Sequence, residues 1–258
     1  MPTALITGAS GGIGKAFAEK LAARQTSLVL VARSEDKLTQ LATQLREQHK
    51  IQVEIIVQDL TETDAATTVF NHTQAKDLTI DLLINNAGFG DYGEFIERDG
   101  EKQIKMLQLN VIALVDLTHK YLPLMRERRS GNIINISSIA GFQPIPYFCV
   151  YAASKAFVLN FSEALWAENK PYGVGILVVC PGPTDTNFFV GADVPEILVN
   201  KGNKMTTPEE VVNDALSALD KGKSTVVSGG IVNEAIANVS RFLPRETTVS
   251  LLEKLFQA

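Results

Sequence analysis

The sequence predicts an α/β fold: an open, doubly wound parallel sheet of about seven strands with helices on both faces. The first observation is that short runs rich in Ile, Val and Leu alternate with stretches of helical length. The second is that several of these runs are apolar at consecutive positions, as strands buried on both faces are. A repeated strand–helix unit requires parallel strands and right-handed crossovers, and this produces a doubly wound sheet.

Seven segments match the strands of this sheet. The expected strands are residues 3–7, 27–32, 51–57, 80–85, 131–137, 173–180 and 224–229. Helical stretches such as GKAFAEKLAAR and SEDKLTQLATQLREQ lie between them. Because no linker, repeat or low-complexity run interrupts this pattern, residues 1–258 are expected to form one dinucleotide-binding and catalytic domain.

The C-terminal extension, residues 230–258, follows the last expected strand. Its apolar residues recur at helical spacing, and Pro244 is expected to divide it into two helices. The favoured interpretation is that Ile231, Val232, Ala235, Ile236 and Val239 cover the domain's own core. The alternative is that the extension forms a subunit contact or a lid over a pocket.

Composition limits the possible partners and location. A net charge of −5 disfavours nucleic acid, which selects a basic face. The two cysteines, Cys149 and Cys180, lie in apolar runs and are expected to be buried, inert thiols of a reducing compartment. The N-terminal MPTALITG lacks the pattern of a secretory signal, and no apolar run approaches a membrane span. A cytoplasmic protein is therefore expected.

The glycine-rich loop TGASGGIG, residues 7–14, predicts a phosphate-binding turn. Gly8 permits the tight turn, Gly12 lets a diphosphate approach the backbone, and Gly14 lets the helix pack on the strand. The spacing, G-x3-G-x-G, is weak as a motif alone, but here it follows the first strand and opens a helix. This placement predicts a Rossmann-type dinucleotide site.

The end of the second strand indicates which dinucleotide binds. No carboxylate stands at Ala32, and Arg33 and Ser34 follow it, so a 2′-phosphate would meet a guanidinium and not a repelling acid. This favours NADP over NAD. The third strand ends at Asp59, which is positioned to accept from the adenine amine. A solvated loop arginine is the simpler interpretation of Arg33.

Tyr151 and Lys155 in VYAASKAF share one helix face, because positions i and i+4 are neighbours. A cation about 4 Å away supplies about 4 kcal/mol at an effective dielectric of about 20, enough to lower a phenol pKa from about 10 to about 7. Ser138, in NISS at the end of the fifth strand, is placed to bind the same substrate oxygen. The simpler interpretation of Tyr151 and Lys155 is a packed tyrosine beside a lysine that extends its ammonium to solvent. Asn110, taken alone, is most simply a hydrogen-bonded amide of the core.

Together, TGASGGIG, NNAG, NISS, YAASK and PGPTDT resemble the motifs of the short-chain dehydrogenase/reductase family, in its order and at its spacing. The resemblance covers residues 1 to about 230 and implies a catalytic tetrad of Asn110, Ser138, Tyr151 and Lys155. It implies that Tyr151 is the general acid for carbonyl reduction or the base for alcohol oxidation, and that Ser138 orients the carbonyl. It further implies that Lys155 lowers the tyrosine pKa and binds the nicotinamide ribose, while Asn110 holds a water.

The residues expected to contact NADP(H) combine the strand ends with what the resemblance implies for the PGPTDT turn. They are Gly8, Ser10, Gly12, Ile13, Gly14, Arg33, Ser34, Asp59, Leu60, Asn86, Ala87, Gly88, Tyr151, Lys155, Pro181, Gly182, Thr184 and Thr186. The resemblance implies a homo-oligomer. The C-terminal extension departs from the family's usual end, which leaves dimer and tetramer open.

The expected substrate is an apolar ketone or aldehyde, or the corresponding alcohol. The residues expected to line its cleft are Ser138, Phe142, Pro144, Phe148, Phe188 and Phe189, which are mostly apolar or aromatic, although the same residues could simply be core. Residues 187–206 are expected to form a mobile flap over this cleft.

Two alternative functions remain open. The cluster Arg126, Arg128 and Arg129 would suit docking of an acidic carrier protein, as in a 3-oxoacyl-carrier-protein reductase, although a basic helix C-terminus is the simpler and favoured interpretation. A regulator that binds NADPH without turnover is the second alternative, which the intact tetrad disfavours. No metal is expected, because His49, His72 and His119 lack ligand spacing.

Overall fold

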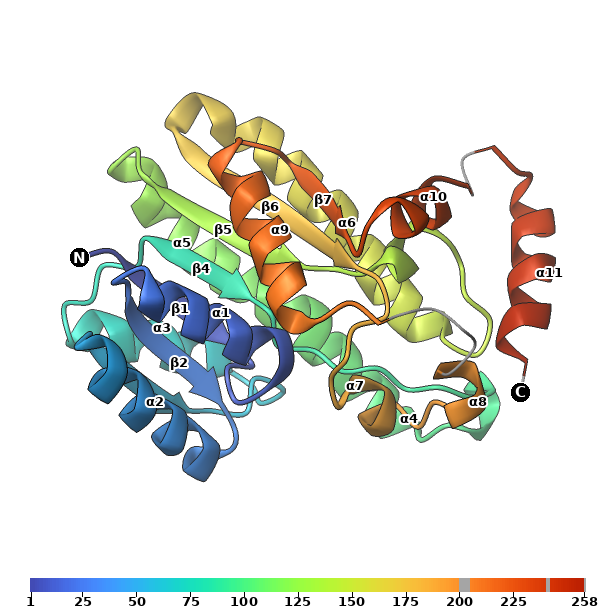
Figure 1. Ribbon diagram of the computed structural model, residues 1–258, viewed down its shortest axis with the longest axis horizontal. Coiled ribbons are helices and arrows are strands. Elements are labelled where there is room, and N and C mark those ends of the chain that lie inside the picture. Colours follow the sequence, from blue (N-terminus) through green and yellow to red (C-terminus); the bar gives the residue numbers. More distant parts are fainter. Residues whose placement is uncertain (200–204, 240–241, 258) are drawn as a thin grey trace.

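The computed structural model describes residues 1–199, 205–239 and 242–257, and within them the chain forms a seven-stranded parallel sheet (Figure 1). The spatial order of the strands is β3-β2-β1-β4-β5-β6-β7. Their bounds are β1 Thr3–Thr7, β2 Ser27–Ala32, β3 Val53–Val57, β4 Leu82–Asn85, β5 Gly131–Ile136, β6 Val174–Pro181 and β7 Thr225–Ser228. The prediction of an α/β fold with a doubly wound parallel sheet is confirmed, and each strand agrees with its expected range to within two residues.

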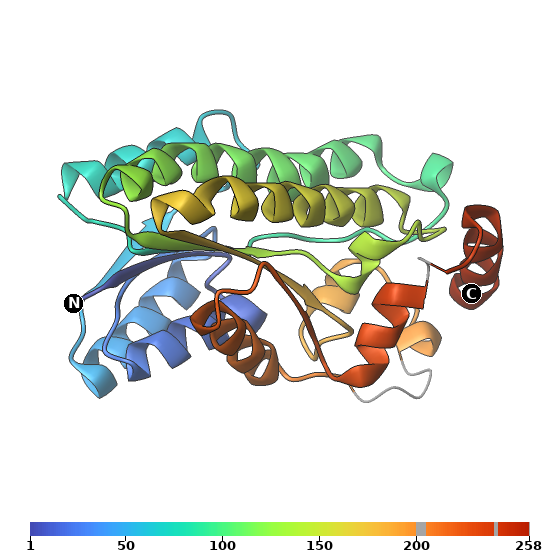
Figure 2. The same ribbon diagram turned by 90° about the horizontal axis from the view of Figure 1, so that it is seen from above.

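Helices cover both faces of this sheet, as Figure 2 shows from above. One layer contains α1 (Gly12–Ala23), α2 (Glu35–His49) and α9 (Pro208–Asp220). The other contains α3 (Ala65–Ala75), α5 (Leu114–Glu127) and α6 (Cys149–Asn169). The shorter elements are η1 Phe95–Glu97, α4 Gly100–Leu107, η2 Gln108–Ala113, η3 Ile139–Phe142, η4 Lys170–Tyr172, α7 Phe188–Gly191 and α8 Glu196–Val199.

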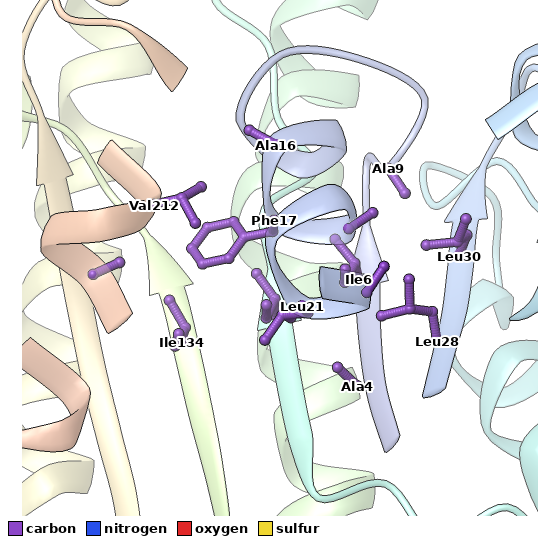
Figure 3. Packing of buried hydrophobic residues seen from close by; sticks show 14 of the residues in the cluster. Ala4, Ile6, Ala9, Ala16, Phe17, Leu21, Leu28, Leu30, Ile134 and Val212 are labelled. Atoms are coloured by element: carbon purple, nitrogen blue, oxygen red, sulfur yellow. The ribbon is translucent and has the colours of Figure 1, made fainter. Parts of the chain in front are cut away.

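The first layer is held by the apolar cluster drawn in Figure 3, where Phe17 of α1 points between Val212 of α9 and Ile134 of β5. Phe17 is fully buried, as are Ile6 and Leu30 on the strands beneath it. Burying a side chain of this size contributes about 1.5–3 kcal/mol. The cluster therefore fixes α1, and with it the glycine loop that precedes α1, against the sheet.

The strand order places a topological switch between β1 and β4, because the chain moves outward from β1 in both directions. In open α/β sheets, ligands bind in the crevice outside the carboxyl ends of the strands at such a point. The arrowheads of β4, β5 and β6 point towards the end of the molecule where α7 and α10 lie (Figure 1). The loops that follow these strands carry the expected site residues.

A buried polar ladder ties α6 to the sheet. The Asn85 side-chain amide of β4 donates to Asn135 Oδ1 of β5 at 2.9 Å, and Asn135 Nδ2 donates to Ser162 Oγ of α6 at 2.9 Å. Buried polar groups that satisfy one another specify one packing arrangement, because any shift leaves them unpaired. The ladder therefore fixes the register of the helix that carries Tyr151 and Lys155.

The C-terminal extension forms two helices, α10 (Ile231–Val239) and α11 (Arg245–Phe256), separated at Pro244 as expected. The interpretation that its apolar stripe covers the core is wrong. Ile231, Val232 and Val239 are 84%, 63% and 47% exposed, and the buried face of α10 is formed by Asn233 and Ala237. The apolar periodicity predicted the helix correctly, but the opposite face of α10, with Asn233 and Ala237, packs against the rest of the domain.

Of the two cysteines expected to be buried, Cys180 is buried and Cys149 is not. Cys180 is fully buried in β6, and burial raises the pKa of its thiol to about 12. Cys149 is exposed, because it is the first residue of α6, where the helix begins at the surface.

Among the residues that the structure describes, no helix is both long and apolar enough to cross a membrane.

Candidate active site

The glycine loop forms a tight cradle at the N-terminus of α1. A Cβ on Gly14 would lie 2.3 Å from the Gly8 carbonyl oxygen, so only glycine lets the helix sit this close to the turn. Gly12 has φ of +50°, and a Cβ there would lie 3.1 Å from Cγ2 of Thr186. The glycine loop and the PGPTDT turn, although distant in the chain, therefore face each other across a narrow space. Such a cradle of backbone N–H groups fits the diphosphate of a dinucleotide.

Asn86 and Thr7 lock the end of β4 against this loop. Asn86 Nδ2 donates to the Thr7 carbonyl at 2.9 Å, while Thr7 Oγ1 accepts from the backbone N–H groups of Asn86 and Ala87 at 2.9 and 3.0 Å. The structure thus brings the NNAG segment beside Gly8, as the cofactor prediction requires. The Asn86 side chain thus holds the backbone at the start of the glycine loop. Its place in the NNAG motif did not indicate this role.

Arg33 and Asp59 form an ion pair, with Nη1 and Oδ2 3.6 Å apart, at the carboxyl ends of β2 and β3. Asp59 also accepts from the Thr61 backbone at 2.9 Å and from the Thr61 hydroxyl at 2.8 Å. Burial raises the pKa of Asp59, but the Thr61 hydrogen bonds and the Arg33 charge outweigh burial and lower it. The Arg33 side chain is 74% exposed, so its guanidinium is open to a ligand at the strand ends.

The PGPTDT turn is fixed from two sides. Ser138 Oγ donates to the Pro181 carbonyl at 3.4 Å, and Thr184 Oγ1 donates to the Gly182 carbonyl at 2.9 Å. Asn233 of α10 packs directly on Gly182, where a Cβ would lie 2.1 Å from its Nδ2. The C-terminal extension therefore supports the turn expected to contact the nicotinamide.

Three of the four tetrad side chains converge at the start of α6. The Ser138 hydroxyl lies close enough to the Tyr151 phenol to lower its pKa, so one substrate oxygen placed between them can contact both. Lys155 Nζ lies 5.7 Å from the centroid of the Tyr151 ring and donates to the Ile136 carbonyl at 2.9 Å. Tyr151 is 9% exposed and Lys155 is 5% exposed, so the pair is almost entirely desolvated.

Asn110 sits in the π-helical segment η2, between α4 and α5. Such bulges occur frequently at functional sites because they turn a side chain away from the regular helix face. Asn110 Oδ1 accepts from the Phe89 N–H at 3.1 Å, and Nδ2 donates to the Phe89 carbonyl at 2.9 Å. A Cβ on Gly88 would lie 2.9 Å from Asn110 Oδ1 and 3.5 Å from Lys155 Nζ. Asn110 therefore lies with the other tetrad residues, beside Gly88 and Lys155. Its expected role of holding a water molecule stays a prediction.

Burial controls the protonation of the Tyr151–Lys155 pair. It raises the pKa of the Tyr151 phenol to about 12, although the neighbouring Ser138 hydroxyl acts in the opposite direction. Burial also lowers the pKa of Lys155 to about 8. The expectation that Lys155 makes the phenol acidic is therefore not met by the chain alone, because desolvation disfavours both charged forms. At neutral pH, Tyr151 carries its proton.

Two of the expected substrate residues form an aromatic wall around Tyr151. The rings of Phe148 and Phe188 lie 5.5 and 5.2 Å from the Tyr151 ring, centroid to centroid. Phe189 packs edge-on against Phe188 at 5.6 Å. Phe142 instead packs on the cluster around Val158 and Cys180, away from this wall, because η3 directs it towards the sheet.

Pro144 is exposed, and part of the expected flap, residues 200–204, lies outside the described residues. The described part of the flap contains α7, which carries Phe188, and α8.

Three further residues belong to the site. Ser154 is 1% exposed, donates to the Tyr151 carbonyl at 2.7 Å and accepts from Asn110 Nδ2 at 3.2 Å. Its spacing of three from Tyr151 places it on the same helix face, a signal that could have identified it. Phe256, at the end of α11, lies 6.5 Å from Phe148, and its carbonyl accepts from the Tyr92 hydroxyl at 2.5 Å. No local pattern predicts that contact across the chain.

The arginine cluster lies at the opposite end of the sheet. Arg126, Arg128 and Arg129 precede β5, whereas Ser138 follows its carboxyl end. Each has an internal role: Arg126 stacks on Tyr172 at 3.6 Å, Arg128 donates to the Ser130 carbonyl at 2.8 Å, and Arg129 donates to the Pro171 carbonyl at 2.8 Å. These contacts favour the structural interpretation of the cluster, and docking of a carrier protein stays an untested alternative.

Comparison with known proteins agrees with this geometry. A family model described as short chain dehydrogenase matches residues 2–194. The chain belongs to the short-chain dehydrogenase/reductase family. Members of this family are oxidoreductases that act on CH–OH groups, and the chain is therefore an enzyme of this class.

Individual relatives span nearly the whole chain. A very-long-chain 3-oxoacyl-CoA reductase of Anas platyrhynchos is 36% identical over 257 residues, covering 97% of this chain and 78% of the relative. The solved short-chain dehydrogenase of Sphingobium yanoikuyae in complex with NADPH is 36% identical, with a TM-score of 0.82, covering 88% of this chain and 87% of that one. The bulky-bulky ketone specific alcohol dehydrogenase of Comamonas testosteroni is 32% identical, with a TM-score of 0.81, covering 100% and 96%.

The burial of Lys155 predicts a specific pH dependence of stability. Its pKa rises from about 8 in the folded chain to the ordinary value of 10.5 on unfolding, so the unfolded state binds more protons between these values. The contribution of Lys155 to stability therefore rises with pH through this window. Lys155→Met, which removes the buried ammonium, is expected to be about 1–2 kcal/mol more stable than the wild type near pH 7.5.

Urea unfolding of the cofactor-free protein at several pH values measures this difference. The advantage of Lys155→Met is expected to shrink as the pH approaches about 10. Lys37→Met, which changes an exposed lysine of α2, is the matched control and should show no such trend. A constant difference between Lys155→Met and the wild type over the whole range would contradict the assignment.

Proposed function

We propose that the protein is an NADP(H)-dependent reductase of bulky, apolar ketones, including 3-oxoacyl thioesters with long chains. The observation that carries this proposal is the convergence of the Tyr151 hydroxyl and the Ser138 hydroxyl under an aromatic wall, with Lys155 and Asn110 behind them. This arrangement holds a carbonyl oxygen between two O–H donors and its apolar substituents against aromatic rings.

The chain's own residues supply orientation and the proton. Tyr151 retains a proton at Oη at neutral pH, because burial raises its pKa to about 12, and it can deliver that proton to a developing alkoxide. The Ala140 N–H, which donates to Ser138 Oγ at 3.1 Å, fixes the position of this hydroxyl. Its single proton, which is directed at the Pro181 carbonyl over 3.4 Å in the chain alone, can turn to the same substrate oxygen and polarise it. The bound dinucleotide supplies the hydride. Lys155 Nζ lies beside Gly88 and Asn110 Oδ1 on the same helix face as Tyr151, where its ammonium can supply the proton that replaces the one Tyr151 gives up.

Arg33 supports the preference for NADP. Its exposed guanidinium stands at the end of β2, and Asp59 holds it there from the end of β3. A 2′-phosphate recognised by a guanidinium forms charge-assisted hydrogen bonds that a 2′-hydroxyl cannot form. The NADPH complex of the Sphingobium yanoikuyae relative is consistent with this choice.

The aromatic residues support a large, apolar substrate. Phe148 and Phe188 contact the Tyr151 ring directly, and Phe256 extends this wall through its contact with Phe148. The names of two relatives, a very-long-chain 3-oxoacyl-CoA reductase and a bulky-bulky ketone specific alcohol dehydrogenase, describe substrates of this kind. The alternative of an NADPH-binding regulator is disfavoured, because binding alone does not require Ser138 opposite Tyr151. That the protein is cytoplasmic and that it forms a homo-oligomer both stay predictions.

Replacing Tyr151 tests the reaction. Tyr151→Phe retains the ring contacts but removes the proton donor, so kcat for reduction of an apolar ketone is expected to fall about a thousandfold. The dissociation constant of NADPH, measured by fluorescence titration, should change less than about threefold. Tyr172→Phe, at a surface tyrosine far from the site, is the matched control. Retention of more than about a tenth of the activity by Tyr151→Phe would show that another group donates the proton.

Replacing Arg33 tests the cofactor preference separately. Arg33→Ala is expected to weaken NADPH binding about tenfold and NADH binding less than about twofold, because a guanidinium at this place would gain charge-assisted hydrogen bonds only from a 2′-phosphate. Arg24→Ala, at the exposed end of α1, should leave both affinities unchanged. Equal weakening of the two cofactors by Arg33→Ala would remove the basis for the NADP preference.

A further inference from the structure

The segment formed by residues 188–193 places Phe188 against Tyr151, and a limited set of contacts holds it there. The Tyr92 backbone N–H donates to the Ala192 carbonyl at 2.8 Å. Ala192 is fully buried, and a Cβ on Gly90 would lie 3.4 Å from its Cβ and 2.7 Å from Phe188 Cζ. The segment thus rests directly on the loop that follows β4.

That loop carries a buried ionic cluster on the same side. The Asp91 carboxylate is completely buried, and Arg98 approaches it with two nitrogens, Nη2 at 2.6 Å and Nε at 2.9 Å. Lys102 Nζ lies 2.5 Å from Asp91 Oδ1, and Gln103 Nε2 donates to Oδ2 at 2.5 Å. One buried carboxylate therefore holds two cations in fixed positions at the start of α4.

Asp193, directly after Ala192, completes this cluster. Its Oδ2 accepts from Arg98 Nη2 at 2.6 Å and from Lys102 Nζ at 3.0 Å. With Asp193 in place, two carboxylates balance two cations; without it, the cluster carries one excess positive charge. The side chain of Asp193 is 55% exposed, whereas those of Arg98 and Lys102 are only 25% and 30% exposed.

We propose that Asp193 is a positioning residue: its paired contacts to Arg98 and Lys102 hold residues 188–193 closed on Tyr151 and so complete the apolar wall for the substrate. This role deepens the proposed function and rests on it. It is separate from the tetrad, because Asp193 acts through Phe188 and not on the reacting atoms.

Three physical arguments support this role. The helix α7 has four residues, too few to be stable without tertiary contacts. A single exposed ion pair contributes little, but Asp193 meets two cations already fixed by Asp91, so little side-chain entropy is lost on pairing. The hydrogen bonds from Lys102 and Arg98 also lower the pKa of Asp193, which indicates that the folded chain favours its charged form.

The variant Asp193→Asn removes the negative charge of Asp193 and keeps the size and shape of its side chain. Asp193 has φ of +57°, a region that asparagine tolerates as well as aspartate does, so the substitution adds no backbone strain. Since the Tyr92 amide donates to Ala192, its hydrogen exchange reports directly on opening of the segment. Exchange at Tyr92 is expected to become about five- to tenfold faster in Asp193→Asn, with the melting temperature within about 2 °C of the wild type.

The matched control is Glu94→Gln, which neutralises an exposed carboxylate on the same loop and should leave Tyr92 exchange unchanged. Unchanged exchange in Asp193→Asn, or equal acceleration in both variants, would overturn the proposal. Asp193→Glu, which retains the charge, should recover part of the protection.

Kinetics supply the second measurement, at saturating NADPH. Asp193→Asn is expected to raise KM for a long-chain or bulky ketone about fivefold, with kcat within about twofold, and to leave KM for a small ketone that does not reach Phe188 unchanged. Equal effects on both substrates would contradict positioning through Phe188. Absence of ketone turnover in the wild type would contradict the proposed function instead, and the exchange measurement on Tyr92 would still decide the role of Asp193.

Discussion

The site depends on the burial of a tyrosine–lysine pair in one helix. Tyr151 and Lys155 are 9% and 5% exposed, and desolvation acts against the charged form of each. The surrounding structure maintains this burial: Lys155 Nζ binds the Ile136 carbonyl, the Ser137 hydroxyl binds the Lys155 carbonyl, and Ser154 binds the Tyr151 carbonyl. A phenol that keeps its proton beside a lysine that readily loses one suits proton delivery to a carbonyl oxygen.

The fold brings the other components to this pair from distant parts of the chain. The switch between β1 and β4 opens the crevice, and the polar ladder through Asn85, Asn135 and Ser162 sets the register of α6. Ser138 links the tetrad to the PGPTDT turn through Pro181. The aromatic wall differs from these parts. Its members come from the N-cap of α6, from α7 and from α11, and its closure depends on contacts between the loop after β4 and residues 188–193.

Features encoded by local pattern could be predicted from the sequence, and features set by tertiary contacts could not. The seven strands, the cradle at Gly12 and Gly14, and the meeting of Ser138 with Tyr151 follow from periodicity and from strand ends gathering at one edge. The exposed face of α10, the exposure of Cys149 and the direction of Phe142 depend on which neighbour packs against each element. The Coulomb argument for the pKa of Tyr151 counted the Lys155 charge and omitted desolvation, which raises this pKa in the chain alone.

The most direct test of this account is a titration of the Tyr151 phenol in the cofactor-free protein. Tyrosine labelled with ¹³C at Cζ, with Tyr151→Phe used to assign the resonance, reports the ionisation of this one side chain. The account predicts a pKa near 12, well above that of an exposed tyrosine. A pKa below about 10 would contradict it, because the Lys155 charge would then outweigh burial without help from a bound dinucleotide.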